Sequence, residues 1–218
     1  MINDERHYDI NGDKLPSVTT ILQATQSEEK KAILAKWKQN VGEIKADQIR
    51  DTAAARGTVM HRIIEGYLTD EGHADLSDMG QLAGQMARHV FKEGLKGSME
   101  EIWGSEITLY YPGLYAGATD LVGIYQGEPA IVDFKQSNRP KKREWVTDYF
   151  TQLAAYAMAH NYVHGTSIQS GIILMCTPNN YFQRFIIKGK EFQRYMFDWI
   201  RRVDEFCNSK LLQRNLEK

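Results

Sequence analysis

The sequence predicts a mixed α/β fold in which helices flank one central sheet, preceded by an amino-terminal hairpin and helices. Apolar residues recur at helical spacing in residues 1–96, whereas β-branched and aromatic runs follow Gly97. A helix then separates three expected strands from two more, and a last helix follows them, an order that suits one covered mixed sheet. A length of 218 residues fits one domain. We therefore expect a single domain over 1–218, with a hairpin and helical wall in 1–96 and the sheet core in 97–218.

The amino-terminal half is expected to start with a small hairpin in residues 7–15, because Asn11-Gly12 is a dipeptide that two-residue turns favour. The hydroxyl group of Ser27 is expected to cap the first helix. Apolar residues at four-residue spacing would line one face of that helix: Ile33, Trp37 and Val41. Two further helices are expected at 51–68 and 77–95, and the second of them carries an apolar stripe formed by Leu82, Met86 and Val90.

The carboxyl-terminal half holds the expected sheet and the helices that cover it. The expected strands span 106–111, 115–125, 130–136, 168–176 and 181–188. A helix at 146–164 separates the first three strands from the last two, and a closing helix is expected at 189–212. We find no internal repeat and no linker, which agrees with one continuous core.

The composition excludes several classes of protein. Hydrophobic residues make up 42% of the chain and charged residues 25%, as in ordinary globular proteins. The longest apolar run, Leu153 to Ala159, is seven residues, whereas a membrane-spanning helix needs about 20. Two cysteines cannot supply a disulfide framework, a four-cysteine zinc site or an iron–sulfur cluster held by four cysteines. A net charge of −1 means that binding of nucleic acid must rest on a local basic patch or on metal ions.

The first six residues bear on location. They have neither the basic-then-apolar order of a signal peptide nor the arginine-rich, acid-poor bias of a transit peptide. We therefore expect no signal or transit peptide and no membrane anchor. The expected location is the cytoplasm of a bacterium or of a phage-infected host cell, where the two cysteines would remain reduced.

The second and third expected strands bring two carboxylates together. If Gln126-Gly127 forms the turn between these strands, opposed positions sum to 253 and Asp120 faces Asp133. Opposed residues of an antiparallel pair point to the same side with Cβ atoms about 4.5 to 5.5 Å apart, so both carboxylates can reach one cation. Lys135 lies on the same side because side chains alternate along a strand. Small residues opposite Lys135 leave that side open for a substrate: Gly117 and Ala118.

Two acids and a lysine on one sheet face suit the hydrolysis of phosphodiester bonds. The carboxylates would hold one or two divalent cations that polarise the phosphate and lower the pKa of bound water. The ammonium group would orient that water and offset developing charge. The alternative is an exposed hairpin whose charges have no catalytic role. Opposed like charges destabilise such a hairpin unless something compensates them, which favours the metal site.

Three motifs occur in the order strand, strand, helix: Gly117-Ala118-Thr119-Asp120, Val132-Asp133-Phe134-Lys135 and Gln152-Leu153-Ala154-Ala155-Tyr156. Together they resemble the PD-(D/E)XK nuclease superfamily in its RecB-like exonuclease branch. The third motif makes the resemblance specific, because Asp-x-Lys alone is weak evidence. Three further segments are similar to the mitochondrial genome maintenance exonucleases and their viral and bacterial relatives: Pro16–Leu22, Gly57–His61 and Lys135–Ser137. The resemblance covers residues 8–165 and implies a restriction-endonuclease-like fold.

The resemblance also implies roles for individual residues. The catalytic residues that it implies are Asp120, Asp133 and Lys135. The implied ligands of Mg²⁺ or Mn²⁺, as one or two ions, are His61, Asp120, Asp133 and the backbone carbonyl of Phe134. Two residues one helical turn apart would contact nucleic acid or brace the site: Gln152 and Tyr156. The acid of the Asp-x-Lys motif is aspartate rather than the commoner glutamate, which shortens its reach and keeps its charge.

Two further acids are candidates for the metal site. A histidine such as His61 is, by itself, more often an ordinary residue than a ligand, but the motif around it reverses that preference. Glu65 lies one helical turn after His61 and would orient it or complete the metal shell. An ordinary neighbour on the helix surface is the equal alternative for Glu65. Glu106 enters the first strand of the sheet and would supply another carboxylate, and a solvated acid on an edge strand explains it at least as well.

A basic segment follows the Asp-x-Lys motif. It contains five basic residues and no acid: Lys135, Arg139, Lys141, Lys142 and Arg143. A solvated loop is the usual explanation of a charge run. The position directly after the catalytic strand favours contact with phosphate groups instead. Aromatic residues that would stack on unpaired bases come next, although at least one of them is expected in the core: Trp145, Tyr149 and Phe150.

These observations predict a Mg²⁺- or Mn²⁺-dependent DNA exonuclease that acts on single-stranded DNA or frayed ends in replication, recombination or repair, for example in a phage. One alternative is a structure-selective endonuclease of the same superfamily. The other is a non-catalytic nucleic-acid-binding module, against which a lysine on an acidic metal face argues. No Walker A sequence occurs in the 218 residues, so any motor would have to be a separate partner. The candidate partners are a helicase, a polymerase or a recombination protein.

Overall fold

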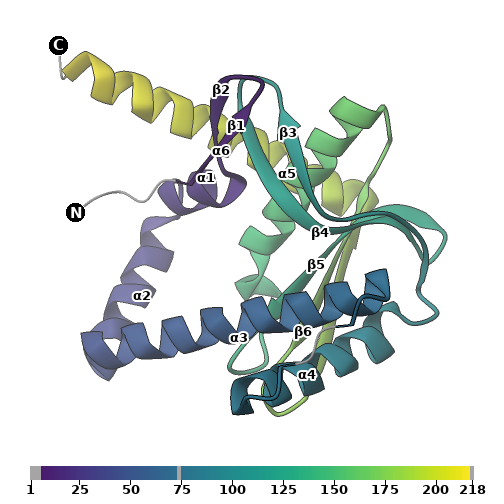
Figure 1. Ribbon diagram of the computed structural model, residues 1–218. Coiled ribbons are helices and arrows are strands. Elements are labelled where there is room, and N and C mark those ends of the chain that lie inside the picture. The colour runs from purple at the N-terminus through teal and green to yellow at the C-terminus, as the bar shows by residue number, and fades with distance from the viewer. Residues whose placement is uncertain (1–5, 73–74, 217–218) are drawn as a thin grey trace.

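A computed structural model describes residues 6–72 and 75–216. The expectation that the chain has no signal or transit peptide concerns mainly residues 1–5, which lie outside the described part. The chain forms an amino-terminal hairpin, a group of helices, and a five-stranded sheet with helices on both faces (Figure 1). This is the mixed α/β architecture that the sequence predicts. In the described residues, no helix combines the length and the apolar character that crossing a membrane requires.

The central sheet has the strand order β3-β4-β5-β6-β7. Its strands are β3 (Met99–Tyr111), β4 (Tyr115–Tyr125), β5 (Glu128–Gln136), β6 (Ser170–Cys176) and β7 (Phe182–Lys188). Neighbouring strands are antiparallel except for β5 and β6, which pair in parallel. The parallel pair requires a crossover, and α5 (Thr147–His164) supplies it. All five predicted strands are confirmed, and β3 begins earlier than expected.

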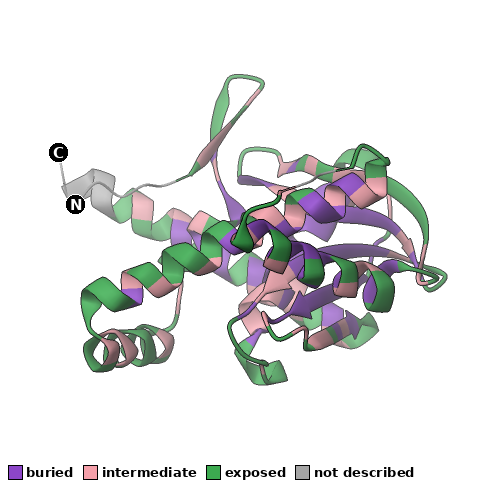
Figure 2. Ribbon diagram, turned by 60° about the horizontal axis from the view of Figure 1, so that its bottom comes forward, coloured by how far each residue is buried: buried purple, intermediate pink, exposed green. Residues whose placement is uncertain are grey.

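Helices cover both faces of the sheet and create two cores. On one face lie α5 and α6 (Gly189–Leu216), which pack on inward side chains such as Ile131 and Ile173. The other face is covered by α3 (Glu43–Thr69) and α4 (Asp78–Val90), which a π-helical turn (Phe91–Leu95) prolongs. Figure 2 shows the buried residues concentrated in the strands and on the inner sides of these helices.

The amino-terminal hairpin forms as predicted, and a helix that the sequence did not reveal follows it. β1 (His7–Ile10) pairs with β2 (Asp13–Pro16) across Asn11-Gly12, whose φ angles are 54° and 90°. Both values meet the requirement of the tight hairpin turn. The additional helix is α1 (Val18–Ala24), with seven residues too short to show an apolar period.

A helical arm, formed by α2 (Glu28–Val41) and the first half of α3, stands beside the sheet (Figure 1). Ser27 caps α2 as predicted. The expected apolar face of α2 is not buried, because α2 buries no residue and Ile33 is 63% exposed. α3 begins at Glu43 rather than at 51, and an ion pair of 2.9 Å between Asp47 and Arg50 supports its exposed first turns.

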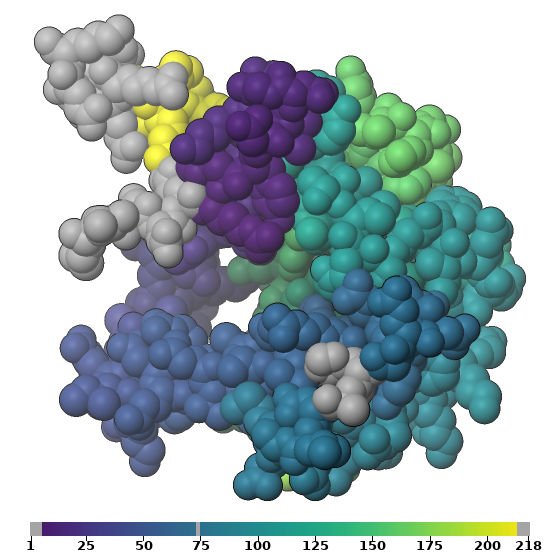
Figure 3. Space-filling view, in the orientation of Figure 1, coloured from purple at the N-terminus to yellow at the C-terminus, as the bar shows by residue number. Residues whose placement is uncertain are grey.

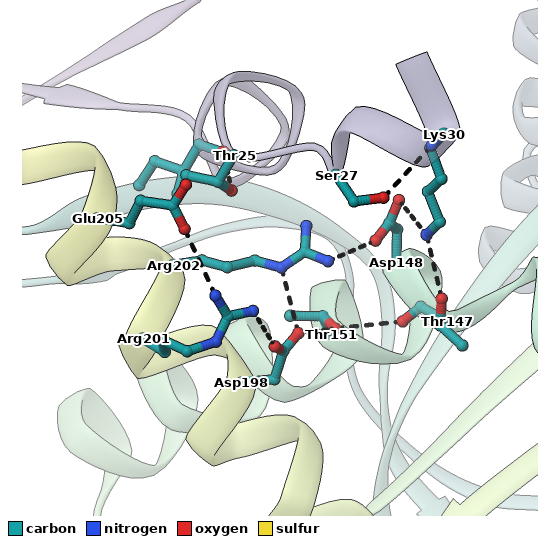
Figure 4. A network of polar contacts seen from close by, with 11 residues as sticks. Thr25, Ser27, Lys30, Thr147, Asp148, Thr151, Asp198, Arg201, Arg202 and Glu205 are labelled. Atoms are coloured by element: carbon teal, nitrogen blue, oxygen red, sulfur yellow. Dashed lines mark hydrogen bonds and ion pairs between the residues drawn. The ribbon is translucent and has the colours of Figure 1, made fainter. Parts of the chain in front are cut away.

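Polar contacts attach α2 to the helices behind the sheet (Figure 4). Lys30 Nζ lies 2.8 Å from Asp148 Oδ2 and 3.1 Å from Thr147 Oγ1, both at the start of α5. Asp148 also accepts a hydrogen bond of 2.7 Å from Arg202 of α6. Arg202 Nε in turn lies 3.2 Å from Asp198 Oδ2. One end of the helical arm is therefore tied to both α5 and α6.

The close approach of β3 to β4 generates a stability prediction. A Cβ atom at Gly123 would lie 1.9 Å from the carbonyl oxygen of Glu101, so alanine would force the strands apart. We expect Gly123→Ala to lower the free energy of unfolding by about 1 to 3 kcal/mol. The control is Gly84→Ala in α4, where the nearest atom would be 3.6 Å away and alanine favours the helix. Equal denaturation midpoints for Gly123→Ala and wild type would contradict the expectation.

Candidate active site

The candidate site lies where β4 and β5 separate. The antiparallel ladder between them ends at Leu121 and Val132, a pair whose numbers sum to 253 as the predicted register requires. Beyond this pair, the Phe134 N–H donates to Asp120 Oδ2 at 2.6 Å, and His61 Nε2 donates to the Phe134 carbonyl at 2.8 Å. Side chains therefore satisfy the backbone groups of Phe134 that a continued β4 would otherwise bind.

Three side chains from three elements converge at this point: His61 of α3, Glu106 of β3 and Asp120 of β4. Each offers one ligand atom, and these atoms lie within 4.8 Å of one another. His61 Nδ1 is 3.5 Å from Asp120 Oδ1 and 3.8 Å from Glu106 Oε1. Because Nε2 donates its hydrogen to a carbonyl, the lone pair of the neutral ring is on Nδ1 and faces the two carboxylates.

Glu106 reaches this group because the backbone of β3 is irregular there. Its φ is +51°, in the left-handed region that a glutamate rarely adopts. It lies between two regular pairs of the β3–β4 ladder, Ser105 with Leu121 and Ile107 with Thr119. Strained backbone of this kind is concentrated at functional sites. The structure thus places Glu106 beside His61 and not only on the solvated edge of the sheet.

Asp133 and Lys135 form an ion pair beside the three-residue group. Lys135 Nζ lies 2.7 Å from Asp133 Oδ1 and 2.5 Å from Asp133 Oδ2, which confirms that both side chains point to one side of β5. Asp133 is only 2% exposed. Within the described residues, the cluster able to hold a metal contains Asp120 but not Asp133, whose carboxylate is turned to the lysine.

Burial and repulsion between like charges control the protonation of the site. Burial, followed by the charge of Asp133, raises the pKa of Asp120 to about 6. Burial disfavours protonated His61, but the nearby carboxylates of Glu106 and Asp120 outweigh this and raise its pKa. Burial also opposes the charge of Lys135, yet Asp133 and Asp120 hold the pKa of this lysine above its usual range.

The donor set fits a divalent cation. Carboxylate oxygens are the ligands of Mg²⁺, and a set that adds one imidazole nitrogen also suits Mn²⁺. A bound cation would offset the repulsion between Asp120 and Asp133 and would return Asp120 to its ionised form.

Gln152 and Tyr156 brace the opposite side of this region from α5. Gln152 Nε2 donates to the Tyr156 hydroxyl at 2.9 Å, and both residues are buried. A Cβ atom at Gly117 would lie 2.7 Å from Tyr156 Cε1, so the tyrosine ring packs directly on the glycine. The side of the sheet that the sequence left open is thus partly filled. A hollow of about 190 Å³ remains, lined by Asp120, Gln152 and Tyr156 among others.

A larger hollow of about 600 Å³ is lined by residues of α3, including Gly57, His61 and Glu65. Glu65 faces this hollow together with His61, but it is not part of the three-residue group. The space-filling view shows an opening between the helical arm and the rest of the molecule (Figure 3). The two hollows meet at Glu106, which lines both.

The chain is similar to several known exonucleases. The human "Mitochondrial genome maintenance exonuclease 1" is 25% identical over 216 residues, which cover 94% of the chain, and the mouse protein is 24% identical over 213 residues, or 93%. The Xenopus tropicalis protein is 27% identical over 183 residues, covering 78% of this chain and 50% of that protein. The chain spans 61% of the length of the human and mouse relatives. No protein-family model matches the chain.

A solved structure shows the same fold. The crystal structure of "Putative exonuclease" from Eubacterium rectale superposes with a TM-score of 0.55 at 18% identity, covering 77% of this chain and 69% of that chain. The sequence relatives are named exonucleases, and the solved structure shares the fold of this chain. The segments that carry the Gly-x-x-Asp and Asp-x-Lys motifs meet where β4 and β5 separate.

The basic segment after the PD-(D/E)XK motif strand divides into engaged and exposed residues. Arg143 donates to Glu191 at 2.8 Å and lies over the ring of Phe150, so internal contacts occupy its guanidinium. Lys141 is bound to Gln183 through its backbone, and burial lowers the pKa of its side chain. Arg139 and Lys142 are exposed, and Arg143 is exposed as well despite its contacts with Glu191 and Phe150.

The three aromatic residues of this segment have different environments. Phe150 is fully buried and is the expected core member. The Tyr149 ring lies 5.1 Å from Lys135 Nζ, so it braces the lysine. Trp145 is 51% exposed, with Lys142 Nζ 5.5 Å from its ring. Trp145 is therefore not a core residue, and about half of its surface is accessible.

The sequence did not single out two arginines near the site. Arg56 is buried and donates to Gln136 at 2.9 and 3.2 Å and to Asn138, which ties α3 to the end of β5. It directly precedes the Gly57–His61 segment, so extending that segment by one residue would have found it. Arg6 lines both hollows, and no local spacing connects it with the motifs.

Measurement of Mn²⁺ affinity tests whether His61 or Glu65 contributes more to metal binding. We expect His61→Ala to weaken Mn²⁺ binding more than Glu65→Ala does, because His61 Nδ1 faces the carboxylates and Glu65 lies outside the group. A residue that only orients a ligand typically changes affinity by about 10- to 100-fold. Calorimetric titration with Mn²⁺ measures both variants, with Glu43→Ala at the far end of α3 as control. The reverse order would exchange the roles of His61 and Glu65.

Proposed function

We propose that the protein is a DNA exonuclease that hydrolyses phosphodiester bonds with the help of Mg²⁺ or Mn²⁺. The observation that carries this proposal is the convergence of His61, Glu106 and Asp120 beside the Lys135–Asp133 pair. Exonuclease relatives that align with over nine-tenths of the chain support it. The non-catalytic module is disfavoured, because a bare binding surface has no need of an ordered lysine on an acidic face.

The proposed ligands divide into two groups. His61, Glu106 and Asp120 already face one another and would hold one cation. Asp133 and the Phe134 carbonyl would complete the shell for one or two ions, since both border the same separation of β4 and β5. The bound cation supplies a Lewis acid that polarises the phosphate and lowers the pKa of water.

Lys135 has the proposed role of positioning and electrostatic support. The carboxylates beside it raise its pKa, so it stays protonated at neutral pH and cannot serve as a general base. Its ammonium hydrogens would orient the attacking water and would stabilise negative charge on the phosphate oxygens. Asp133 and the Tyr149 ring hold the ammonium group in place for this task.

The proposed substrate is single-stranded DNA or a frayed end, in replication, recombination or repair. Trp145 offers an exposed ring beside Lys142, and aromatic rings next to cations bind unpaired bases with little sequence preference. Arg139 adds a further exposed cation, whereas Arg143 is proposed to support the fold. A helicase, a polymerase or a recombination protein would act as a separate partner that exposes the strand.

Digestion of labelled DNA tests the proposed activity. We expect wild-type protein to shorten linear single strands with Mg²⁺ or Mn²⁺ and to stop when chelator is added. Asp120→Asn, Asp133→Asn and Lys135→Ala should each reduce the rate by more than about tenfold, which corresponds to ~1.4 kcal/mol, because they remove charge that holds the cation or stabilises the transition state.

The same assay includes closed single-stranded circles and strands labelled at either end. Resistance of the circles supports an exonuclease, and rapid cutting of them would move the assignment to an endonuclease of the same superfamily. If Asp120→Asn, Asp133→Asn or Lys135→Ala keeps more than a tenth of the wild-type rate, the substituted residue has another role.

Trp145 tests the proposed preference for unpaired bases. Trp145→Ala should cost about 1 to 3 kcal/mol of binding on single-stranded DNA and much less on duplex, where bases are already stacked. Binding of both substrates is measured by fluorescence anisotropy, with Arg143→Gln as the comparison. Arg143→Gln should lower Tm through the lost contact with Glu191. Equal loss on both substrates with a lower Tm for Trp145→Ala would show that Trp145 only packs.

A further inference from the structure

Arg6 occupies a junction in the site. Two residues line both the hollow of about 190 Å³ and the hollow of about 600 Å³: Arg6 and Glu106. Glu106 belongs to the three-residue group that could hold a metal. Arg6 therefore lies at the junction of the two hollows, which Glu106 also borders.

The backbone of Arg6 is anchored to the strand that carries Asp120. The Arg6 carbonyl accepts hydrogen bonds from Ser17 N–H at 2.9 Å and from Thr20 Oγ1 at 3.1 Å. Ser17 in turn forms a β-bridge with Ala116 of β4. This chain of contacts fixes the backbone of Arg6 relative to β4, although half of the hairpin residues that follow Arg6 are exposed.

The guanidinium of Arg6 is also oriented, and it has no acidic partner in the described part of the chain. Its central carbon lies 5.0 Å from the centroid of the Tyr8 ring, which holds the group by a cation–π contact. No carboxylate of residues 6–72 or 75–216 lies at ion-pair distance from it. Lys135, by contrast, is bound to Asp133. Within the described residues, the charge of Arg6 is thus not neutralised by an ion pair.

The charge balance of the site shows why such a cation is needed. The acids that line the hollows, Glu65, Glu106 and Asp120, outnumber the lining arginines, Arg6 and Arg62, and would repel the phosphates of an approaching strand. A divalent cation offsets this repulsion at the scissile phosphate only. A second cation at fixed distance would favour entry of the next phosphate and would set the position of the strand along the site.

We propose that Arg6 binds a phosphate group that neighbours the scissile phosphate, and that it positions the substrate strand on the metal-binding group. A guanidinium suits this role because its fork donates two parallel hydrogen bonds to phosphate oxygens. The proposal rests on the proposed nuclease function and extends it. It assigns a task to the amino-terminal hairpin and α1, which hold Arg6 through Tyr8, Ser17 and Thr20.

Three variants test this role: Arg6→Gln, Arg6→Lys and, as control, Lys14→Gln. Lys14 is exposed on the same hairpin and lines neither hollow. We expect Arg6→Gln to raise KM for linear single-stranded DNA about tenfold, as for a lost charged hydrogen bond. Lys14→Gln should match wild type. Arg6→Lys should give an intermediate KM, since lysine keeps the charge but lacks the fork.

The salt dependence of DNA binding distinguishes a phosphate contact from a structural role, because loss of a merely structural contact would not change it. Binding is measured with each substitution placed in Lys135→Ala protein, so that the oligonucleotide is not cut. The slope of log K against log salt should be smaller by about 0.7 for Arg6→Gln and unchanged for Arg6→Lys, because one phosphate contact is lost only in the first. Tm and Mn²⁺ affinity should equal those of the parent protein.

The outcomes separate this inference from the proposed function. If wild-type protein does not digest linear DNA, the proposed function is wrong. If wild type digests it and Arg6→Gln matches Lys14→Gln in KM and slope, only the role of Arg6 is wrong. A lower Tm or weaker Mn²⁺ binding in Arg6→Gln with an unchanged slope would also overturn the proposal, since it would show that Arg6 supports the fold.

Discussion

The backbone of Phe134 has no strand partner toward β4, and the rest of the candidate site depends on this. Its N–H binds the Asp120 carboxylate and its carbonyl binds His61, so two side chains from different elements replace one stretch of ladder. Because buried backbone groups must be paired, these two contacts also fix where α3 lies against β5. The separation of the strands and the convergence of the ligands are thus one feature of the structure.

The same feature creates an electrostatic cost. The pKa of Asp120 is about 6 in the folded protein, above the ordinary value of 3.8. A raised carboxyl pKa means that, without metal, this group lowers stability as pH rises from about 4 through 6, and that its cost is absent in stronger acid. A bound cation offsets that cost and stabilises the folded state by mass action. Metal binding and stability are therefore coupled at this carboxylate.

The sheet region and the amino-terminal elements are held in place by different kinds of contact. The sheet, α4, α5 and the buried parts of α3 and α6 rest on two apolar cores, which hold β4 and β5 rigidly. The helical arm and the hairpin bury little and are held by polar contacts, such as Lys30 with Asp148 and the Arg6 carbonyl with Ser17. Rigid strands suit the placement of metal ligands, and polar, accessible elements suit contact with a charged strand.

Local sequence is sufficient for contacts within an element or across a tight turn. The structure contains the predicted turn at Asn11-Gly12 and the predicted helix cap at Ser27. It also contains the predicted pairing register of β4 with β5, and it places Asp133 and Lys135 on one side of β5. Each of these features follows from local residue preferences or from the alternation of side chains along a strand. Contacts between distant elements were decided by tertiary packing. His61 meets Phe134 across 73 positions, Glu106 turns inward through a left-handed backbone, and Arg143 is held by Glu191. No spacing rule encodes such contacts, because they depend on how whole helices pack on the sheet.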